Sequence, residues 1–268
     1  MNDLSTTLNA IEAILEQAGK EIILPAFYSS MQSSTKADGS IVTETDLACQ
    51  QFIQDELECL DKSIAFLGEE MTEAEQLACL QHSEGRYWCL DPLDGTSNFI
   101  AHFPCFAISL ALIEHGIVQL ACIHDPVRKE TFTAIHGQGA CLNGAPISTS
   151  HNDQLQHAVG FVDFKRLAPP LATQFITRPC YRSQRNIGSC ALEWAWLAAG
   201  RGHFIIHGSE KIWDFSAGSL IASEAGCVVS SFDKVSLFPC TTLSTSVLAA
   251  CNPSTHASLK LQLSKLNY

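Results

Sequence analysis

The chain changes its hydrophobic pattern near residue 148, and this change constrains the fold more than any other feature. Before it, the apolar runs FAISLALIE, IVQLACIH and ETFTAI lie between Phe106 and Ile135, separated by the polar segments HG and DPVRK. This spacing predicts an antiparallel meander, which HGQGACLNGAPIS continues through tight turns. After residue 148, strand patterns alternate with helical ones, including 190–201 and 212–227, which is typical of α/β layering.

We therefore expect two domains, 1–147 and 148–268, since 268 residues exceed the ~150 residues of an average domain. The first would be α+β with a large antiparallel sheet, and the second α/β. Two helical patterns open the chain, from Asp3 to Ala18 and from about Asp46 to Leu60, followed by strand patterns at 63–70 and from 86 onward. In the second half, a strand over AVGFVDF is followed by a helical candidate of about 20 residues.

Composition excludes several classes of protein. Apolar residues make up 46% of the chain and the formal net charge is −12. This favours a globular fold and disfavours a nucleic-acid or anionic-membrane binder, because such surfaces need positive charge. No secretory leader pattern and no apolar stretch near ~20 residues is present, and the twelve cysteines contain no CxxC pair. The sequence therefore predicts a cytoplasmic protein with reduced, mostly buried cysteines.

Acidic residues follow the strand pattern that begins at residue 86. Asp91 and Asp94 stand three positions apart, with Gly95 directly after them. Two carboxylates with the Leu93 carbonyl between them suit Mg²⁺, which prefers oxygen ligands in octahedral geometry. The amides at the start of the following helix offer an anion site. A plain Asp-Gly turn with a helix N-cap explains the same residues, so both interpretations stay open.

Two further acidic positions could complete such a site. Glu69-Glu70 ends the preceding strand pattern, and Asp214 lies between Trp213 and Phe215 at the start of a helix of small residues. A solvated strand exit explains the glutamates, and helix capping explains Asp214. An aspartate in so apolar a segment must be capping, paired or metal-bound.

Together these segments resemble a known family. GEE at 68–70, DPLDGTSNF at 91–99 and WDFSAG at 213–218 are similar, in order and spacing, to the three motifs of the inositol monophosphatase family of Mg²⁺-dependent, lithium-sensitive phosphatases. TETD at 43–46, FPCFAISLAL, HGQGACLNGAPIS, RNIGSCA and SEAGC extend the similarity over nearly the whole chain. The resemblance implies a layered αβαβα sandwich of the inositol monophosphatase/fructose bisphosphatase type.

The resemblance also implies a metal centre with two or three Mg²⁺ ions. Glu69, Asp91 and the Leu93 carbonyl would hold the first ion. Asp91, Asp94 and Asp214 would hold the second, and Glu69 would reach a third, weaker ion. By the same resemblance, Mn²⁺ is an alternative cofactor, and Li⁺ or Ca²⁺ would inhibit.

Catalytic roles follow from the same comparison. Asp46 with Thr96 would orient or deprotonate the attacking water, and Glu69 counts with them as catalytic. The amides of Gly95 and Thr96 would hold the phosphate while water attacks in line, without a covalent intermediate. Lys36 matches a basic position of the family near the catalytic centre, although an ordinary solvated lysine would look the same.

The expected substrate contacts depart from the family pattern at one position. His207 stands where inositol-specific members carry a glutamate that contacts sugar hydroxyls, and an imidazole offers only one donor and one acceptor. Arg185 precedes the substrate-lining turn and could pair with an anion or lie in a surface salt bridge. The residues that match that turn are Gly188, Ser189 and Cys190.

Several functions remain open within this resemblance. A phosphatase acting on inositol monophosphate or a related polyol or sugar phosphate ranks first, because the chain has little room for the insertions of the nucleotidase branch. A 3'(2'),5'-bisphosphate nucleotidase and a fructose 1,6-bisphosphatase are the alternatives. A regulatory member that binds a protein partner, as some bacterial relatives do with the transcription machinery, is an alternative of another class. Members are commonly homodimers, so we expect a homodimer acting on a small phosphorylated metabolite.

Overall fold

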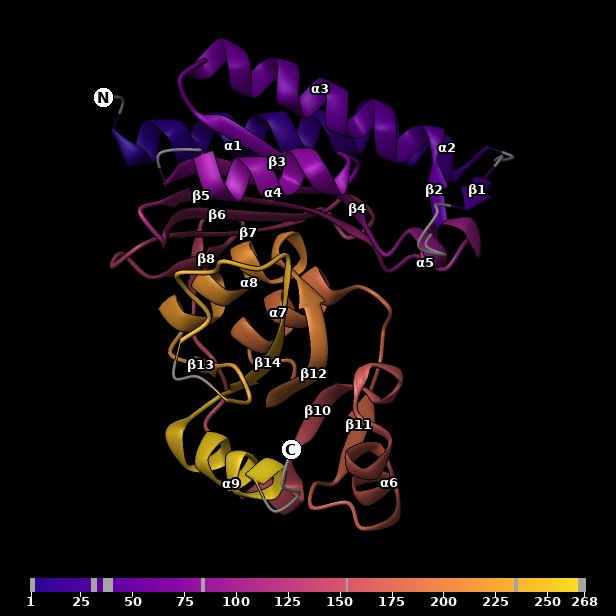
Figure 1. Cartoon of the computed structure of the whole chain (residues 1–268), viewed down its shortest axis with the longest axis vertical. Helices are drawn as coiled ribbons and strands as arrows, with labels where there is room; N and C mark the ends of the chain where they lie inside the picture. Colours follow the sequence, from indigo (N-terminus) through magenta and orange to yellow (C-terminus); the bar gives the residue numbers. More distant parts are fainter. Residues whose placement is uncertain are drawn as a thin grey trace.

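Helices and sheets alternate along the longest axis of the molecule (Figure 1). The computed structural model describes residues 3–29, 33–35, 41–82, 85–152, 154–233 and 236–264. A seven-stranded sheet with the order β3-β4-β5-β6-β7-β8-β9 forms the first β layer, and only its β3–β4 pair is parallel. Its strands are β3 Ala65–Gly68, β4 Arg86–Asp94, β5 Ala107–Glu114, β6 Ile117–Asp125, β7 Glu130–Ile135, β8 Ala140–Leu142 and β9 Ala145–Ile147.

Two long helices cover one face of this sheet. They are α1 (Leu4–Ala18), which continues through a π-helical turn (Gly19–Ile23) into α2 (Leu24–Phe27), and α3 (Glu44–Leu60). Ile11 and Ile53 of these helices pack with Leu110 and Leu120 of the sheet in one buried cluster. The remaining elements of this half are the short hairpin β1 (Ser33–Thr35) and β2 (Ile41–Thr43), and the helices α4 (Glu73–His82) and α5 (Thr96–Ile100).

Helices α7 (Cys190–Ala198) and α8 (Ile212–Glu224) lie between the two sheets. Trp194 and Phe215 belong to a buried cluster that also contains Ala111 of the first sheet and Ile205 of the second. Because both faces of the first sheet are covered, nearly every residue of β5 is buried, and its sequence shows a continuous apolar run rather than an alternating one.

The second sheet has five strands with the order β11-β10-β12-β14-β13. Its outer face packs against α6 (Pro169–Thr177) and α9 (Pro253–Ser264), through Phe175 and Leu259. The predicted αβαβα sandwich is therefore confirmed. Its strands are β10 Val159–Asp163, β11 Ser183–Arg185, β12 Phe204–Lys211, β13 Val228–Ser230 and β14 Ser244–Ala250, and two short 3₁₀ turns, Leu155–His157 and Phe164–Arg166, flank β10.

One predicted element is wrong. The helical candidate of about 20 residues after β10 contains only the nine residues of α6, and β11 follows it. The last strand of the first sheet ends at Ile147 and the first strand of the second begins at Val159; the division into domains at 147/148 stays a prediction. In the part of the chain that the structure describes, no helix is long and apolar enough to cross a bilayer.

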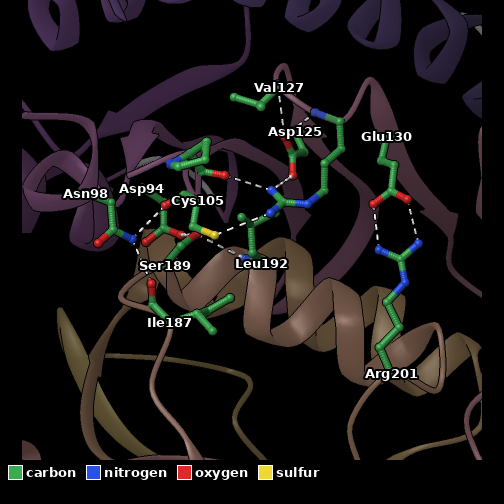
Figure 2. Close-up of polar contacts among 12 residues, drawn as sticks. Asp94, Asn98, Cys105, Asp125, Val127, Glu130, Ile187, Ser189, Leu192 and Arg201 are labelled. Carbon is green, nitrogen blue, oxygen red and sulfur yellow. Dashed lines mark hydrogen bonds and ion pairs between the residues drawn. The ribbon is translucent and has the colours of Figure 1, made fainter. Parts of the chain in front are cut away.

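Polar contacts join the first sheet to the helices beneath it. Arg201, just after α7, makes two hydrogen bonds of 2.6 Å with the carboxylate of Glu130 on β7 (Figure 2). The carboxylate of Glu224, at the end of α8, accepts hydrogen bonds from the amides of Gly137 and Gly139. Such bidentate, charge-assisted contacts fix orientation as well as adding stability, so they fix the position of α7 and α8 against the first sheet.

The crossing of α7 and α8 depends on a glycine. A Cβ atom on Gly218 would lie 2.3 Å from Cβ of Trp194, an atom tied directly to the backbone. Alanine at this helical position would gain up to about 1 kcal/mol of helix propensity, but overpacking a core costs about 1–3 kcal/mol. We predict that Gly218→Ala lowers the free energy of unfolding by about 1–2 kcal/mol, measured by urea denaturation. The matched control Ser223→Ala, at an exposed position of the same helix, should stay within about 0.5 kcal/mol of wild type; a stabilised Gly218→Ala would contradict the packing argument.

Candidate active site

A β-bulge at the end of β4 brings Asp91 and Asp94 to the same side of the sheet. Asp91 pairs with Ser109 and Asp94 with Ala107, so three steps along β4 match two steps along β5. In a regular strand, residues three apart face opposite sides, and the extra residue of a bulge reverses this. Asp91 and Asp94 are 2% and 7% exposed, respectively, so two carboxylates lie close together in a buried place.

Asp91 lies among other acids. The Leu93 amide donates to its Oδ1 at 3.0 Å, and the carboxyl group of Glu69 lies beside it. Burial raises the pKa of Asp91 well above its ordinary value, and the negative charges of Glu69, Asp94 and Asp214 raise it further. One carboxylate oxygen from each of the three aspartates lies within 4.8 Å of the others. Glu69 of the GEE motif and Asp214 of the WDFSAG motif therefore lie close to the two aspartates of DPLDGTSNF.

Asp94 is held by the first residues of α7. Its carboxylate accepts hydrogen bonds from the Ser189 hydroxyl, from the amide of Cys190 (3.2 Å) and from that of Ala191 (2.8 Å). Figure 2 shows Asp94 and Ser189 in this contact. Burial nevertheless raises the pKa of Asp94 to about 6. Asp94 thus acts as a cap, but for a helix about a hundred residues away rather than for α5.

Asp214 caps a helix and also lies among the other acids. The Lys211 amide donates to its Oδ2 at 3.1 Å, which caps α8. The pKa of Asp214 is raised well above its ordinary value by burial and by the charges of Asp94 and Glu69. Capping and membership of the acidic cluster therefore occur together.

Asp46 and Thr96 meet next to these acids. The Thr96 hydroxyl lies 3.0 Å from Asp46 Oδ1 and 3.2 Å from the Leu93 carbonyl oxygen, so it can donate to either acceptor. Asp46 also accepts from the Thr43 amide at 2.8 Å in the capping box that begins α3. Burial raises the pKa of Asp46, which makes its carboxylate a better proton acceptor.

Gly95 lets the chain turn sharply at this point. Its φ is +96°, and a Cβ atom there would lie 2.9 Å from the Cys105 carbonyl oxygen and 3.2 Å from that of Gly188. Any larger residue would therefore push the 188 turn away. The amide of Thr96, at the first position of α5, has no acceptor within that helix, which leaves it available for an anion.

A cavity of about 670 Å³ lies beside the acidic cluster and includes Asp214 in its wall. Arg185 is not among its lining residues; its guanidinium is exposed and donates to the Ser183 hydroxyl and the Gln184 carbonyl. Lys36, the other basic residue predicted for the site, lies outside the described residues. The predicted substrate residues that line the cavity are Gly188, Ser189, Cys190 and His207.

His207 is a neutral residue in this wall. Burial lowers its pKa to about 4, although the carboxylate of Asp163, 3.7 Å from Nε2, opposes the shift. The Ser209 amide donates to Nδ1 at 3.2 Å, so the ring proton resides on Nε2. At neutral pH the position therefore offers one donor and one acceptor, as its residue type implied.

Sequence reasoning missed five residues near the cavity. Lys165, Arg166 and Lys211 line it and supply positive charge. Glu193 and Glu210 are buried, and burial raises the pKa of each to about 8. Glu193 accepts from the Ile187 amide at 2.8 Å, and Glu210 from the Trp194 indole at 2.8 Å. The signal that could have found Glu193 is a glutamate inside the apolar helix CALEWAWLAA.

Comparison with known proteins identifies the family. The profile of the inositol monophosphatase family matches residues 3–266, which is nearly the whole chain. The chain belongs to the inositol monophosphatase family. The resemblance of the three acidic motifs is thereby confirmed, and the chain belongs to a family of phosphatases.

Individual members of the inositol monophosphatase family are also similar. The chain is 38% identical over 198 residues to the fructose-1,6-bisphosphatase/inositol-1-monophosphatase of Thermotoga maritima, covering 72% of each chain. It is 35% identical over 209 residues to the Nus factor SuhB of Escherichia coli, covering 76% of each. The solved structure of the extragenic suppressor protein suhB from Bartonella henselae superposes with a TM-score of 0.84 at 26% identity, covering 97% of this chain and 99% of that one.

The acidic cluster fits the metal dependence of the inositol monophosphatase family. Three carboxylates converge, and among the described residues no lysine or arginine forms an ion pair with Asp91, Asp94 or Asp214. Buried carboxylates that repel one another need a compensating positive charge. Oxygen-only donors suit a hard divalent ion, so the side chains present can hold the metal that the family requires.

The raised pKa of Glu193 generates a prediction about stability. Its folded pKa, about 8, exceeds the ordinary value of about 4.3 expected in the unfolded chain. The folded state therefore keeps a proton that the unfolded state loses, and stability declines as pH rises from about 4.3 to 8. Glu193→Gln keeps the acceptor for the Ile187 amide and should lose less stability between pH 5 and 8 than wild type, as measured by urea denaturation. Glu56→Gln, on the exposed face of α3, should keep the wild-type slope; an unchanged slope in Glu193→Gln would contradict a neutral buried Glu193.

Proposed function

We propose that the protein is a Mg²⁺-dependent phosphomonoesterase that hydrolyses inositol monophosphate or a related small polyol or sugar phosphate. The observation that carries the proposal is the convergence of Asp91, Asp94 and Asp214 within 4.8 Å, next to the Asp46–Thr96 pair. The metal ligands would be Glu69, Asp91, the Leu93 carbonyl, Asp94 and Asp214, as the family resemblance implies. Bound Mg²⁺ would supply charge compensation for the phosphate and the leaving oxygen and a lowered pKa for water.

The side chains of this site would carry the proton and orient the reactants. The Thr96 hydroxyl, held between Asp46 and the Leu93 carbonyl oxygen, would orient the attacking water. Asp46 would receive the proton through that hydroxyl, and its raised pKa favours this transfer. The amides of Gly95 and Thr96 would donate to the phosphate oxygens, while the alcohol leaves on the opposite side of phosphorus.

A second substrate class is favoured by the charges of the cavity. Lys165, Arg166 and Lys211 line it, and His207 stands where a hydroxyl-binding glutamate was expected. A second anionic group on the substrate, as in fructose 1,6-bisphosphate, would pair with these cations. The name of the Thermotoga maritima relative includes both activities.

Other family-based expectations remain predictions. A protein-binding role is supported by the 35% identity to the E. coli protein named as a Nus factor. We also keep as predictions the homodimer, the cytoplasmic location and inhibition by Li⁺ or Ca²⁺. The same holds for the roles of Ser189, Cys190 and His207 in binding substrate.

Removing one metal ligand should abolish most of the activity. We expect Asp94→Asn to lower kcat/KM for inositol 1-phosphate by about 10³-fold or more, because metal-ion catalysis supplies several kcal/mol. The measurement is phosphate release with Mg²⁺, before and after EDTA. Asparagine keeps one oxygen to accept from the Ala191 amide, which preserves the contact to α7. Asp214→Asn serves as an independent second variant, and activity that survives EDTA and both substitutions would refute the proposal.

The cationic residues should matter only for a second anionic group. We expect the double variant Lys165→Ala/Arg166→Ala to lower kcat/KM for fructose 1,6-bisphosphate by about tenfold, since an exposed ion pair contributes up to about 1 kcal/mol. The same variant should change inositol 1-phosphate hydrolysis by less than about twofold. Arg178→Ala, an exposed cation outside the cavity, is the matched control. Equal losses for both substrates would contradict a second anion site.

A further inference from the structure

A second group of side chains with metal-binding atoms adjoins the cavity, shares no residue with the three aspartates, and contributes Cys190 and His207 to the cavity wall. It consists of Cys190, His207 and Glu210, and one ligand atom from each lies within 4.8 Å of the others. Cys190 is the first residue of α7, and the other two come from β12. Thiol, imidazole and carboxylate are the three donor types of protein zinc sites.

A second β-bulge builds this group. His207 pairs with Val247 and Glu210 with Thr245, so three steps along β12 match two steps along β14. Without the extra residue, His207 and Glu210 would point to opposite faces of the sheet. The bulge therefore brings the two side chains to one face, where α7 places Cys190.

The group is buried and incompletely paired. His207 and Glu210 are 5% and 1% exposed, respectively. Glu210 Oε2 accepts from the Trp194 indole, but its Oε1 has no hydrogen-bond donor among the described residues, and no lysine or arginine among them forms an ion pair with this carboxylate. Burial raises the pKa of Glu210 to about 8, so its carboxyl group keeps a proton at neutral pH. A bound cation would stabilise the ionised carboxylate in place of that proton.

We propose that Cys190, His207 and Glu210 form a binding site for Zn²⁺ or a similar thiolate-preferring divalent ion, and that an ion bound there blocks the substrate cavity. On binding, the Cys190 thiol and the Glu210 carboxyl group would each release a proton to solvent, and their sulfur and oxygen atoms would bind the ion together with the His207 ring and a water as the fourth ligand. Donor atoms of a tetrahedral zinc site lie about 3.4–3.6 Å apart. The three donor atoms lie within 4.8 Å of one another, so side-chain rotations that shorten these separations would complete the geometry.

The donor chemistry separates this site from the aspartate cluster. Thiolate and imidazole favour Zn²⁺ over Mg²⁺, whereas oxygen-only donors suit Mg²⁺. Cys190 contacts both sites through different atoms, because its amide donates to Asp94 while its sulfur belongs to the new group. Excess Mg²⁺ should therefore occupy the aspartates and leave the second site open.

Asp163 would supply a further feature of zinc sites if its carboxylate, now just beyond hydrogen-bond distance of the His207 ring, moved closer on metal binding. With the Ser209 amide on Nδ1 and Asp163 Oδ2 at 3.7 Å from Nε2, the neutral ring carries its proton toward Asp163. A metal at Nδ1 would replace only the Ser209 contact and keep the carboxylate behind the ring. Metal-bound histidines usually have such a carboxylate partner, and its loss costs about 10–100-fold in metal affinity.

The test is a titration of the whole protein with Co²⁺ in excess Mg²⁺. A cysteine ligand gives Co²⁺ a thiolate charge-transfer absorption band that oxygen and nitrogen ligands do not give. We expect this band in the wild type, its loss on addition of Zn²⁺, and its absence in Cys190→Ser. Cys59→Ser, which changes an exposed cysteine on α3, is the matched control and should keep the band.

Two isosteric variants test the other members. Asp163→Asn changes only the residue behind His207 and should weaken Co²⁺ binding by about 10–100-fold. Glu210→Gln removes a direct ligand while keeping an acceptor for the Trp194 indole, so it should weaken Co²⁺ binding by more than about 100-fold. A missing band in the wild type, a band that persists in Cys190→Ser, or unchanged affinity in Glu210→Gln would overturn the site. If Cys190→Ser does not fold, as judged by circular dichroism, the Glu210→Gln titration decides.

Only the blocking effect rests on the proposed function. In saturating Mg²⁺, Zn²⁺ should inhibit phosphate release competitively with substrate, and Glu210→Gln should raise the inhibitory concentration at least about tenfold. Inhibition that competes with Mg²⁺ and is unchanged in Glu210→Gln would overturn the blocking effect. A wild type without phosphatase activity would refute the proposed function, while the Co²⁺ band would still report the site.

Discussion

The contact between Asp94 and the beginning of α7 is the interaction on which the arrangement of the site depends. Asp94 ends a strand of the first sheet, and the three donors that reach it begin a helix of the second half. Hydrogen bonds to a charged group contribute about 1.5–3 kcal/mol each, and the positive end of the helix dipole adds to them. The same contact places the turn at 188 against Gly95, and with it one wall of the cavity.

This arrangement places several carboxyl groups close together in a buried region, where water cannot solvate their negative charge. The pKa of Asp94 rises to about 6 despite its hydrogen bonds, because burial outweighs them. The pKa values of Asp91 and Asp214 are raised as well. Protonation relieves this repulsion when no ion is bound, and in the function we propose bound cations would take the place of those protons. Such cations would explain how an acidic chain can belong to a phosphatase family.

The meander of the first half and the strand–helix alternation of the second could be predicted from local sequence patterns, whereas the layered sandwich and the meeting of the three acidic motifs were predicted through the family resemblance. The length of α6 was also readable, since Arg178 precedes Pro179 and the residue before a proline disfavours helix. Other features had no local signal. Lys165 and Arg166 reach the cavity only through the packing of a short 3₁₀ turn next to β10. Glu210 faces inward only because β12 contains an extra residue, which no hydrophobic period shows.

The two bulges limit how this protein can change over evolutionary time. Each extra residue brings two side chains that are three positions apart to one face, in β4 at Asp91 and Asp94 and in β12 at His207 and Glu210. Deleting a single residue within either bulge would restore a regular ladder and turn one member of the pair away. Substitutions can alter the chemistry of these positions gradually, whereas changes of length there remove a pair in one step. Variation in these two segments should therefore occur in residue type and not in residue number.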